Sequence, residues 1–207
     1  MAIKTNLKRN KKGQVVLSST TKYAVDFGCG NNKHTQEHIK NVNLGDVDFV
    51  IGVDFVETEH SNIVHNLTQF PYPFENESVD VIVTSHFIEH LDGFERAKFF
   101  DECYRILKPN GKMRHTFPYA NSNRATQDFT HKFPPINENS FAYFNKEWRE
   151  ANKLTHGYYD LISNFSANVL YLFQDGTLQN KTSEVQQREI MFNINKISDL
   201  IVDMVKI

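Results

Sequence analysis

The sequence lacks long apolar runs and is poor in cysteine. No stretch approaches the roughly 18 residues that cross a membrane as a helix, and no hydrophobic segment follows the basic N-terminus. Only two cysteines occur in 207 residues, Cys29 in a glycine turn and Cys103 in an expected helix, so a disulfide is disfavoured. These absences predict a protein without a membrane span, located in the cytoplasm.

The sequence also lacks a strong net charge, which is −2 at pH 7. No general electrostatic field therefore attracts nucleic acid. The distribution is uneven, because residues 1–12 hold five basic residues and no acid: Lys4, Lys8, Arg9, Lys11 and Lys12. We expect residues 1–15 to form a basic, solvated N-terminal arm, with a tether for an acidic partner as the alternative. Residues 16–207 are expected to form one domain.

Hydrophobic residues are plentiful at 40%, with 17 Phe and 8 Tyr, which excludes a disordered chain. Strand-like and helix-like segments alternate, which predicts an α/β, doubly wound, mostly parallel sheet. Strands are expected at 23–27, 49–53, 63–67, 79–84 and 112–117, and helices near 34–40, 94–107 and 139–153. One or two strands are expected within 158–173. Residues 199–207 fit a closing strand best, although a helical stripe also fits them.

Two strand ends carry residues suited to ligand binding. The segment from Tyr23 ends in Asp26-Phe27-Gly28-Cys29-Gly30, and the next expected strand ends at Asp54. Parallel strands place such ends at one sheet edge, where a glycine turn allows close approach and a carboxylate can hold a ribose. The pattern predicts a site for a nucleoside-bearing cofactor.

The third glycine of a dinucleotide fingerprint is missing, because Lys33 stands in its place. That glycine lets a helix pack close to its strand near a pyrophosphate. Asp26, just ahead of the turn, is also a poor neighbour for a diphosphate. The turn therefore suits a cofactor with a cationic end better than a dinucleotide.

Further motifs follow in a specific order. They comprise Phe70-Pro71-Tyr72-Pro73-Phe74, Ser78-Val79-Asp80 and Leu107-Lys108-Pro109-Asn110-Gly111. With the glycine turn and Asp54, they make residues 23–119 resemble the class I S-adenosylmethionine-dependent methyltransferases in their small single-domain form. The resemblance implies a seven-stranded sheet with helices on both faces and an antiparallel strand near the C-terminus. The chain departs from the family pattern at Asn110, in place of glycine, and at Asn66, where an aspartate is frequent near the adenine.

The resemblance implies S-adenosyl-L-methionine as cofactor and assigns roles residue by residue. The implied cofactor-binding residues are Asp26, Gly28, Cys29, Gly30, Asp54, Phe55, Asn66, Leu67 and Ser85. Asp54 would accept the ribose hydroxyls, and Asp26 would supply negative charge near the ammonium. Phe55 and Leu67 would bracket the adenine. A turn-capping role remains open for either acid taken singly.

Methyl transfer requires positioning more than covalent help, and a general base only when the acceptor arrives protonated. His86 is the first candidate for that base and His131 the second, since unperturbed histidines titrate near neutral pH. Either could instead be structural, His86 as a hydrogen-bonding loop residue and His131 as a surface residue. His90 is expected to cap or pack.

The acceptor is expected to present an O or N atom on a small molecule, a sugar or a protein. The motifs of DNA base methylation are absent around Thr84-Ser85-His86-Phe87, so DNA is a disfavoured substrate. A lid over residues 118–145 is expected to wall an apolar pocket. Its aromatic residues are Tyr119, Phe129, Phe133, Phe141, Tyr143 and Phe144, around polar Asn121, Arg124 and His131.

Three other functions compete with the methyltransferase. The first is a non-catalytic cofactor-binding or interaction module on the same fold. A zinc metalloprotease is suggested by the H-x-x-E-H match of His86, Glu89 and His90, but five residues match easily by chance, and no metal is expected. A nicotinamide-dependent oxidoreductase is disfavoured by Lys33.

Overall fold

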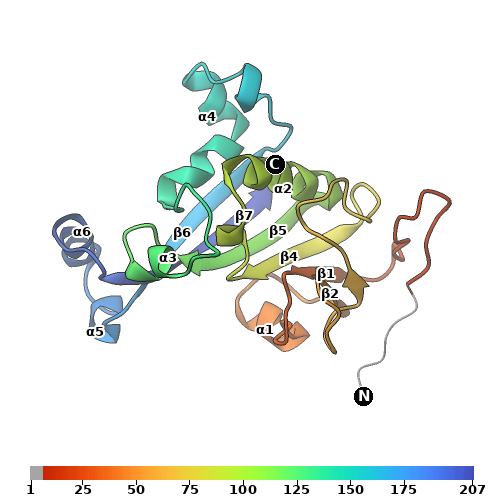
Figure 1. The fold of residues 1–207 in the computed structure, drawn as a ribbon, viewed down its shortest axis with the longest axis horizontal. Helices are drawn as coiled ribbons and strands as arrows, with labels where there is room; N and C mark the ends of the chain where they lie inside the picture. The colour runs from red at the N-terminus through yellow and green to blue at the C-terminus, as the bar shows by residue number, and fades with distance from the viewer. Residues whose placement is uncertain (1–6) are drawn as a thin grey trace.

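The computed structural model describes residues 7–207, apart from the side chains of Tyr158, Met191 and Phe192. One seven-stranded sheet with the order β3-β2-β1-β4-β5-β7-β6 organises the chain (Figure 1). Its strands are β1 (Tyr23–Phe27), β2 (Phe49–Asp54), β3 (Ile63–Val64), β4 (Val79–Ser85), β5 (Leu107–Pro118), β6 (Phe165–Phe173) and β7 (Ile197–Lys206).

Strands β1 to β5 are parallel, and β7 pairs antiparallel with both β5 and β6. The expected mostly parallel sheet with an antiparallel strand near the C-terminus is confirmed. The ambiguous C-terminal segment is a strand, with alternate residues of Ile197–Lys206 buried. Because β7 runs against its neighbours, its first residues lie at the carboxyl edge of the parallel strands.

Helices cover both faces of the sheet, as expected (Figure 1). The α-helices are α1 (Gln36–Asn41), α2 (Gly93–Ile106), α3 (Asn123–Gln127), α4 (Lys146–Ala151), α5 (Gly176–Gln179) and α6 (Ser183–Phe192). Short 3₁₀ helices are η1 (Ile88–His90), η2 (Glu138–Phe144) and η3 (Gly157–Tyr159). Helices α5 and α6 lie within residues 174–196, for which no element is expected from the sequence.

Residues of β1 and β4 contribute to two cores, one on each face of the sheet. On β1, Val25 and Phe27 pack into the larger core with Phe99 and Phe100 of α2. Ala24 faces the other side and packs with Ile39 of α1. Helix α2 begins at a capping box in which Asp92 accepts hydrogen bonds from the Phe94 and Glu95 backbone and Glu95 accepts one from the Asp92 backbone.

Three expected elements differ from those observed. The helix expected over 139–153 is divided at Asn145, whose backbone is extended. The Asn145 side chain accepts from Trp148 N to cap α4 and donates to Phe165 O, so tertiary bonding to β6 accompanies the break. The third strand ends at Val64 rather than residue 67, and strand five begins at Leu107 rather than residue 112.

Residues 7–15 do not form the frayed arm that the charge distribution predicts. Val15 is fully buried. It forms an isolated β-bridge with Phe74 and donates its N–H to Pro73 O at 2.8 Å. Leu7 packs against the same core. The boundary expected at residue 15 therefore cuts through a packed segment, while Lys4 lies outside the described residues. Within residues 7–207, no helix combines the length and apolarity needed to cross a bilayer.

Replacement of Gly28 by alanine is expected to destabilise the fold more than replacement of Gly13. Both glycines have left-handed φ values, 71° and 77°, so either alanine costs roughly 1–2 kcal/mol. Only at Gly28 would the new Cβ meet another described side chain, the Phe87 ring at 2.8 Å, which adds about 1–3 kcal/mol of overpacking. Urea denaturation of the two variants measures the difference. Equal destabilisation would show that Phe87 yields without cost.

Candidate functional site

The turn after β1 is held by the end of β2. Gly28 N and Cys29 N donate to Val53 O at 2.8 and 3.3 Å, and Gly30 N donates to Asp54 Oδ2 at 2.8 Å. The glycine turn and the carboxylate predicted to lie together are therefore joined directly. No described atom lies within 4 Å of the position that a Gly30 Cβ would take, so the turn faces open space there.

Asp54 is nearly buried, with 6% of its surface exposed. Its Oδ1 accepts from Val56 N at 3.0 Å, so each carboxylate oxygen already accepts one backbone hydrogen bond. A carboxylate oxygen has a second lone pair. The carboxylate is thus fixed in orientation and can still accept bonds from hydroxyl groups.

Asp26 is buried beneath the loop that follows the turn. Its Oδ2 accepts from His34 N at 2.7 Å and lies 2.9 Å from His34 Nδ1. The side chain therefore ties the loop before α1 to the end of β1. A role for Asp26 near a cofactor ammonium stays a prediction.

The other expected cofactor-binding residues have mixed environments. Phe55 is 73% exposed directly after β2, while Cys29 and Leu67 are buried. Asn66 is exposed, and its side-chain oxygen accepts from Thr68 in a local turn. Phe55 therefore presents a large exposed aromatic surface beside the end of β2. The adenine contacts of Leu67 and Asn66 stay predictions.

His86 follows Ser85, the last residue of β4, in a left-handed conformation with φ 51°. Its N–H donates to Thr116 O at 2.8 Å, and its Nδ1 lies 3.4 Å from Glu89 Oε1. The interaction with the Glu89 carboxylate raises the pKa of His86 above its ordinary value. Burial acts in the opposite direction, and the negative charge of Asp199 adds a smaller increase.

His131 approaches the same region from another loop. Its ring lies 5.0 Å from that of His90, and the adjacent Lys132 N donates to Glu89 O at 2.9 Å. The two candidate bases, His86 and His131, thus both lie around Glu89.

Sequence reasoning missed Glu89 and Asp199 as members of this site. Glu89 is 5% exposed and Asp199 is 6% exposed. The H-x-x-E-H match was the available signal for Glu89, although the helix a protease needs is absent: η1 begins at Ile88, after His86. Asp199 lies on antiparallel β7, 3.6 Å from Arg124. No local sequence motif predicts that this distant residue joins the site.

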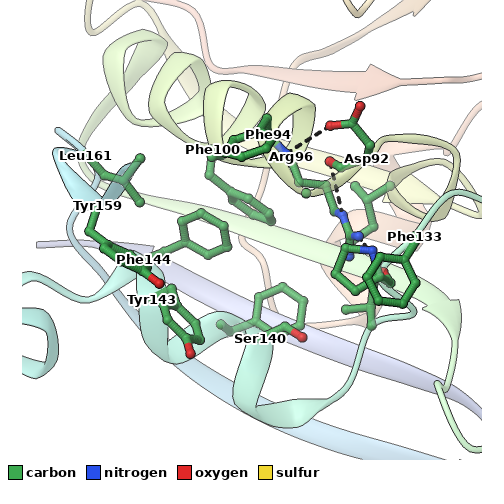
Figure 2. A pocket seen from close by; sticks show the side chains of 16 residues that line it. Asp92, Phe94, Arg96, Phe100, Phe133, Ser140, Tyr143, Phe144, Tyr159 and Leu161 are labelled. Carbon is green, nitrogen blue, oxygen red and sulfur yellow. Dashed lines mark hydrogen bonds between the residues drawn. The ribbon is translucent and has the colours of Figure 1, made fainter. Parts of the chain in front are cut away.

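A cavity of about 630 Å³ lies between the start of α2 and residues 133–161. Figure 2 shows Phe133 and Arg96 near one end and Tyr143, Phe144, Tyr159 and Leu161 near the other. The expected apolar pocket is present, walled by Phe133, Phe141, Tyr143 and Phe144. Its lining does not include the other aromatics expected there, Tyr119 and Phe129, or the polar Asn121, Arg124 and His131; its polar members are Asp92, Arg96 and Ser140.

Residues 25–114 match the family described as "Methyltransferase domain". Over these residues the chain is similar to methyltransferase domains, and its fold is that of the class I methyltransferases. A crystal structure of a SAM-dependent methyltransferase from Archaeoglobus fulgidus has the same fold, with a TM-score of 0.60, 17% identity, and 90% and 86% of the two chains covered. Geranyl diphosphate C-methyltransferase from Streptomyces coelicolor A3(2) has a TM-score of 0.55, at 13% identity over 92% and 74%.

Sequence relatives of the methyltransferase domain occur in mycobacteria. A protein of Mycolicibacterium smegmatis, named "Probable S-adenosylmethionine-dependent methyltransferase", is 37% identical over 87 residues, which cover 37% of this chain and 31% of that protein. The relative Rv3030 of Mycobacterium tuberculosis is 31% identical over 116 residues, covering 51% and 37%. The chain thus spans about a third of the length of the curated relatives it matches.

The Cys29 thiol inside the turn is expected to be unreactive at neutral pH. Burial, followed by the charges of Asp26 and Asp54, raises its pKa from 9.0 to about 12. Cys103 is fully buried, and its pKa is also raised. At pH 8, DTNB should label the folded protein about a thousandfold more slowly than a free thiol, because the thiolate is the reactive form. Labelling of two thiols in urea is the control, and rapid labelling of the folded chain would contradict the buried turn.

Proposed function

We propose that this chain binds S-adenosylmethionine at the carboxyl ends of β1, β2 and β4 and transfers its methyl group to an acceptor. The observation that carries the proposal is the hydrogen bond from Gly30 N to Asp54 Oδ2. It fixes a glycine turn beside a nearly buried carboxylate at the sheet edge where α/β proteins bind nucleosides. The open space beside Gly30 fits a cofactor that approaches the backbone closely.

Each residue of the glycine turn and of the end of β2 has a defined task in this proposal. Asp54 accepts hydrogen bonds from the ribose hydroxyls, while its backbone bonds keep the carboxylate in place. Gly28 and Gly30 bring the backbone close to the amino-acid end of the cofactor. The exposed ring of Phe55 offers one face to the adenine. The bound cofactor supplies a methyl group on a sulfonium, an electrophile that needs no covalent help from the protein.

Positioning then accounts for much of the rate. Ser85 and His86 end β4 at the same sheet edge, and we place the reacting methyl beside them. Holding nucleophile and methyl in line at about 3 Å contributes much of the acceleration. His86 accepts a proton from the acceptor, with His131 as the second candidate. Its raised pKa makes His86 a stronger base than a solvent-exposed histidine.

The cavity favours an acceptor with an apolar portion. Its lining residues are mainly aromatic and aliphatic, and Ile88 of η1 connects it to the loop that follows His86. Arg96 donates hydrogen bonds to the Pro134 and Asp92 carbonyls, so part of its hydrogen-bonding capacity is used within the protein and not for the acceptor. A small molecule that places an O or N atom toward His86 fits this arrangement better than a sugar or a folded protein.

A non-catalytic cofactor-binding module on the same fold is the competing function. Purified protein, incubated with radiolabelled S-adenosylmethionine and fractionated cell extract, separates the two possibilities. Label transferred to a small apolar fraction supports the enzyme and the proposed acceptor class. Tight donor binding without transfer to any fraction favours the module.

Asp54→Asn is expected to weaken binding of S-adenosylmethionine by about 1.5–3 kcal/mol, or roughly 10- to 150-fold, because charge-assisted hydrogen bonds to the ribose become neutral ones. Isothermal titration calorimetry measures the change. The control is Asp46→Asn, since Asp46 is an exposed aspartate paired with Lys40. Equal affinity in Asp54→Asn and in the control would place the ribose elsewhere.

A further inference from the structure

We propose that Glu89, His90 and His131 form a binding site for one divalent transition-metal ion of the zinc class. A ligand atom of each residue lies within 4.8 Å of those of the other two. The three residues come from two loops, with Glu89 and His90 in η1 and His131 in the segment after α3. The site is distinct from the glycine turn, and its occupancy does not depend on the methyl donor.

The surroundings of the buried Glu89 carboxylate favour the binding of a cation. Its side chain is 6% exposed, and among the described residues neither carboxylate oxygen accepts a hydrogen bond. The nearest charged partner is His86 Nδ1 at 3.4 Å, longer than a normal hydrogen bond. A buried carboxylate without hydrogen bonds is costly unless a charge or a metal ion compensates it.

The hydrogen bonds of the two imidazoles favour the tautomer with the proton on Nδ1. His131 Nδ1 lies 3.1 Å from Ala125 O, and a carbonyl only accepts, so Nδ1 carries the proton. The lone pair then lies on Nε2, which is 3.9 Å from Asp128 Oδ2. His90 Nδ1 lies 3.1 Å from Thr130 Oγ1, whose own proton is donated to Asp128 Oδ1 at 2.6 Å. The hydroxyl therefore accepts from His90 Nδ1, and the lone pair of His90 also lies on Nε2. Such outer hydrogen bonds commonly orient histidine ligands of metals.

Two hydrogen bonds of Lys132 tie the loop of His131 to η1 and to α2. Lys132 N donates to Glu89 O at 2.9 Å, and Lys132 Nζ bonds Glu95 Oε2 at 2.7 Å. Ligand atoms around zinc at about 2.0–2.2 Å lie roughly 3–3.6 Å apart. Ion binding therefore needs each pair of ligand atoms to close by at most about 1–2 Å, a movement within the reach of small χ changes.

The donor set indicates the class of metal. One carboxylate and two imidazoles suit zinc, cobalt and iron(II), whereas calcium and magnesium prefer oxygen ligands throughout. Three protein ligands leave coordination positions open, which is typical of catalytic zinc sites. The site differs from the protease pattern of H-x-x-E-H, because the second imidazole comes from residue 131 and His86 lies outside the set.

The test uses the full chain, dialysed against EDTA and titrated calorimetrically with ZnCl₂, with Co²⁺ absorption spectroscopy as a second readout. We expect one equivalent of Zn²⁺ per chain and a Co²⁺ spectrum without a thiolate charge-transfer band. Glu89→Gln and His131→Gln should each lower the Zn²⁺ affinity at least about 100-fold. His156→Gln removes an exposed histidine outside the cluster and should bind as the parent chain does.

Melting temperatures distinguish a loss of zinc binding from a loss of folding in the variants. Zn²⁺ should raise the melting temperature of the parent chain and of His156→Gln, but not that of Glu89→Gln, which preserves side-chain volume while removing a buried charge. Binding that is substoichiometric, that survives in both ligand variants, or that shows cobalt–thiolate bands would overturn the site. Donor binding, measured separately on EDTA-treated protein, distinguishes failure of this proposal from failure of the proposed methyltransferase function.

Discussion

The hydrogen bond between Gly30 N and the Asp54 carboxylate is the constraint on which the site depends. It joins a left-handed turn to the end of the neighbouring strand, and Val53 O reinforces it by accepting from Gly28 N and Cys29 N. Parallel pairing of Tyr23 with Phe49 through Phe27 with Val53 brings the two ends level. In the proposed function the same carboxylate binds the ribose, so one interaction would serve both folding and recognition.

The sheet topology gathers further charges at the same edge. Glu89 follows β4, His131 lies beyond β5, and Asp199 arrives on β7 because that strand is antiparallel. Buried acids at such an edge are stable only where cations or hydrogen bonds compensate them. Asp54 has two backbone donors and Asp26 has His34, whereas Glu89 has an imidazole at 3.4 Å and no hydrogen bond among the described residues. Glu89 thus differs from Asp54 and Asp26, because both of its carboxylate oxygens lack a hydrogen bond among the described residues.

Much of the fold could be predicted from local patterns, because buried parallel strands are short apolar runs and α2 has both a cap and an apolar stripe. The break at Asn145 could not, since it accompanies a hydrogen bond to Phe165, twenty residues away. For the site, the glycine turn and Asp54 lie within 24 residues and share a motif. Glu89 and His131 are 42 residues apart and meet only through the path of the loop after β5. The packing of Val15 has no signal in the composition, because lysines dominate the residues around it while its one apolar side chain is buried in the core.

The 3₁₀ turn η1 separates two environments within three residues. Ile88 is fully buried and lines the apolar cavity, whereas Glu89 lies among histidines. Side chains one residue apart on such a tight turn point in directions about 120° apart, so a single short element can present an apolar wall on one side and a polar cluster on the other. A ligand whose apolar body occupies the cavity would then have its polar end directed past η1, toward His86 and the end of β4. Because the wall and the polar cluster lie on one short turn, the placement of such a ligand's body in the cavity would also determine the placement of its reacting atom in the proposed function.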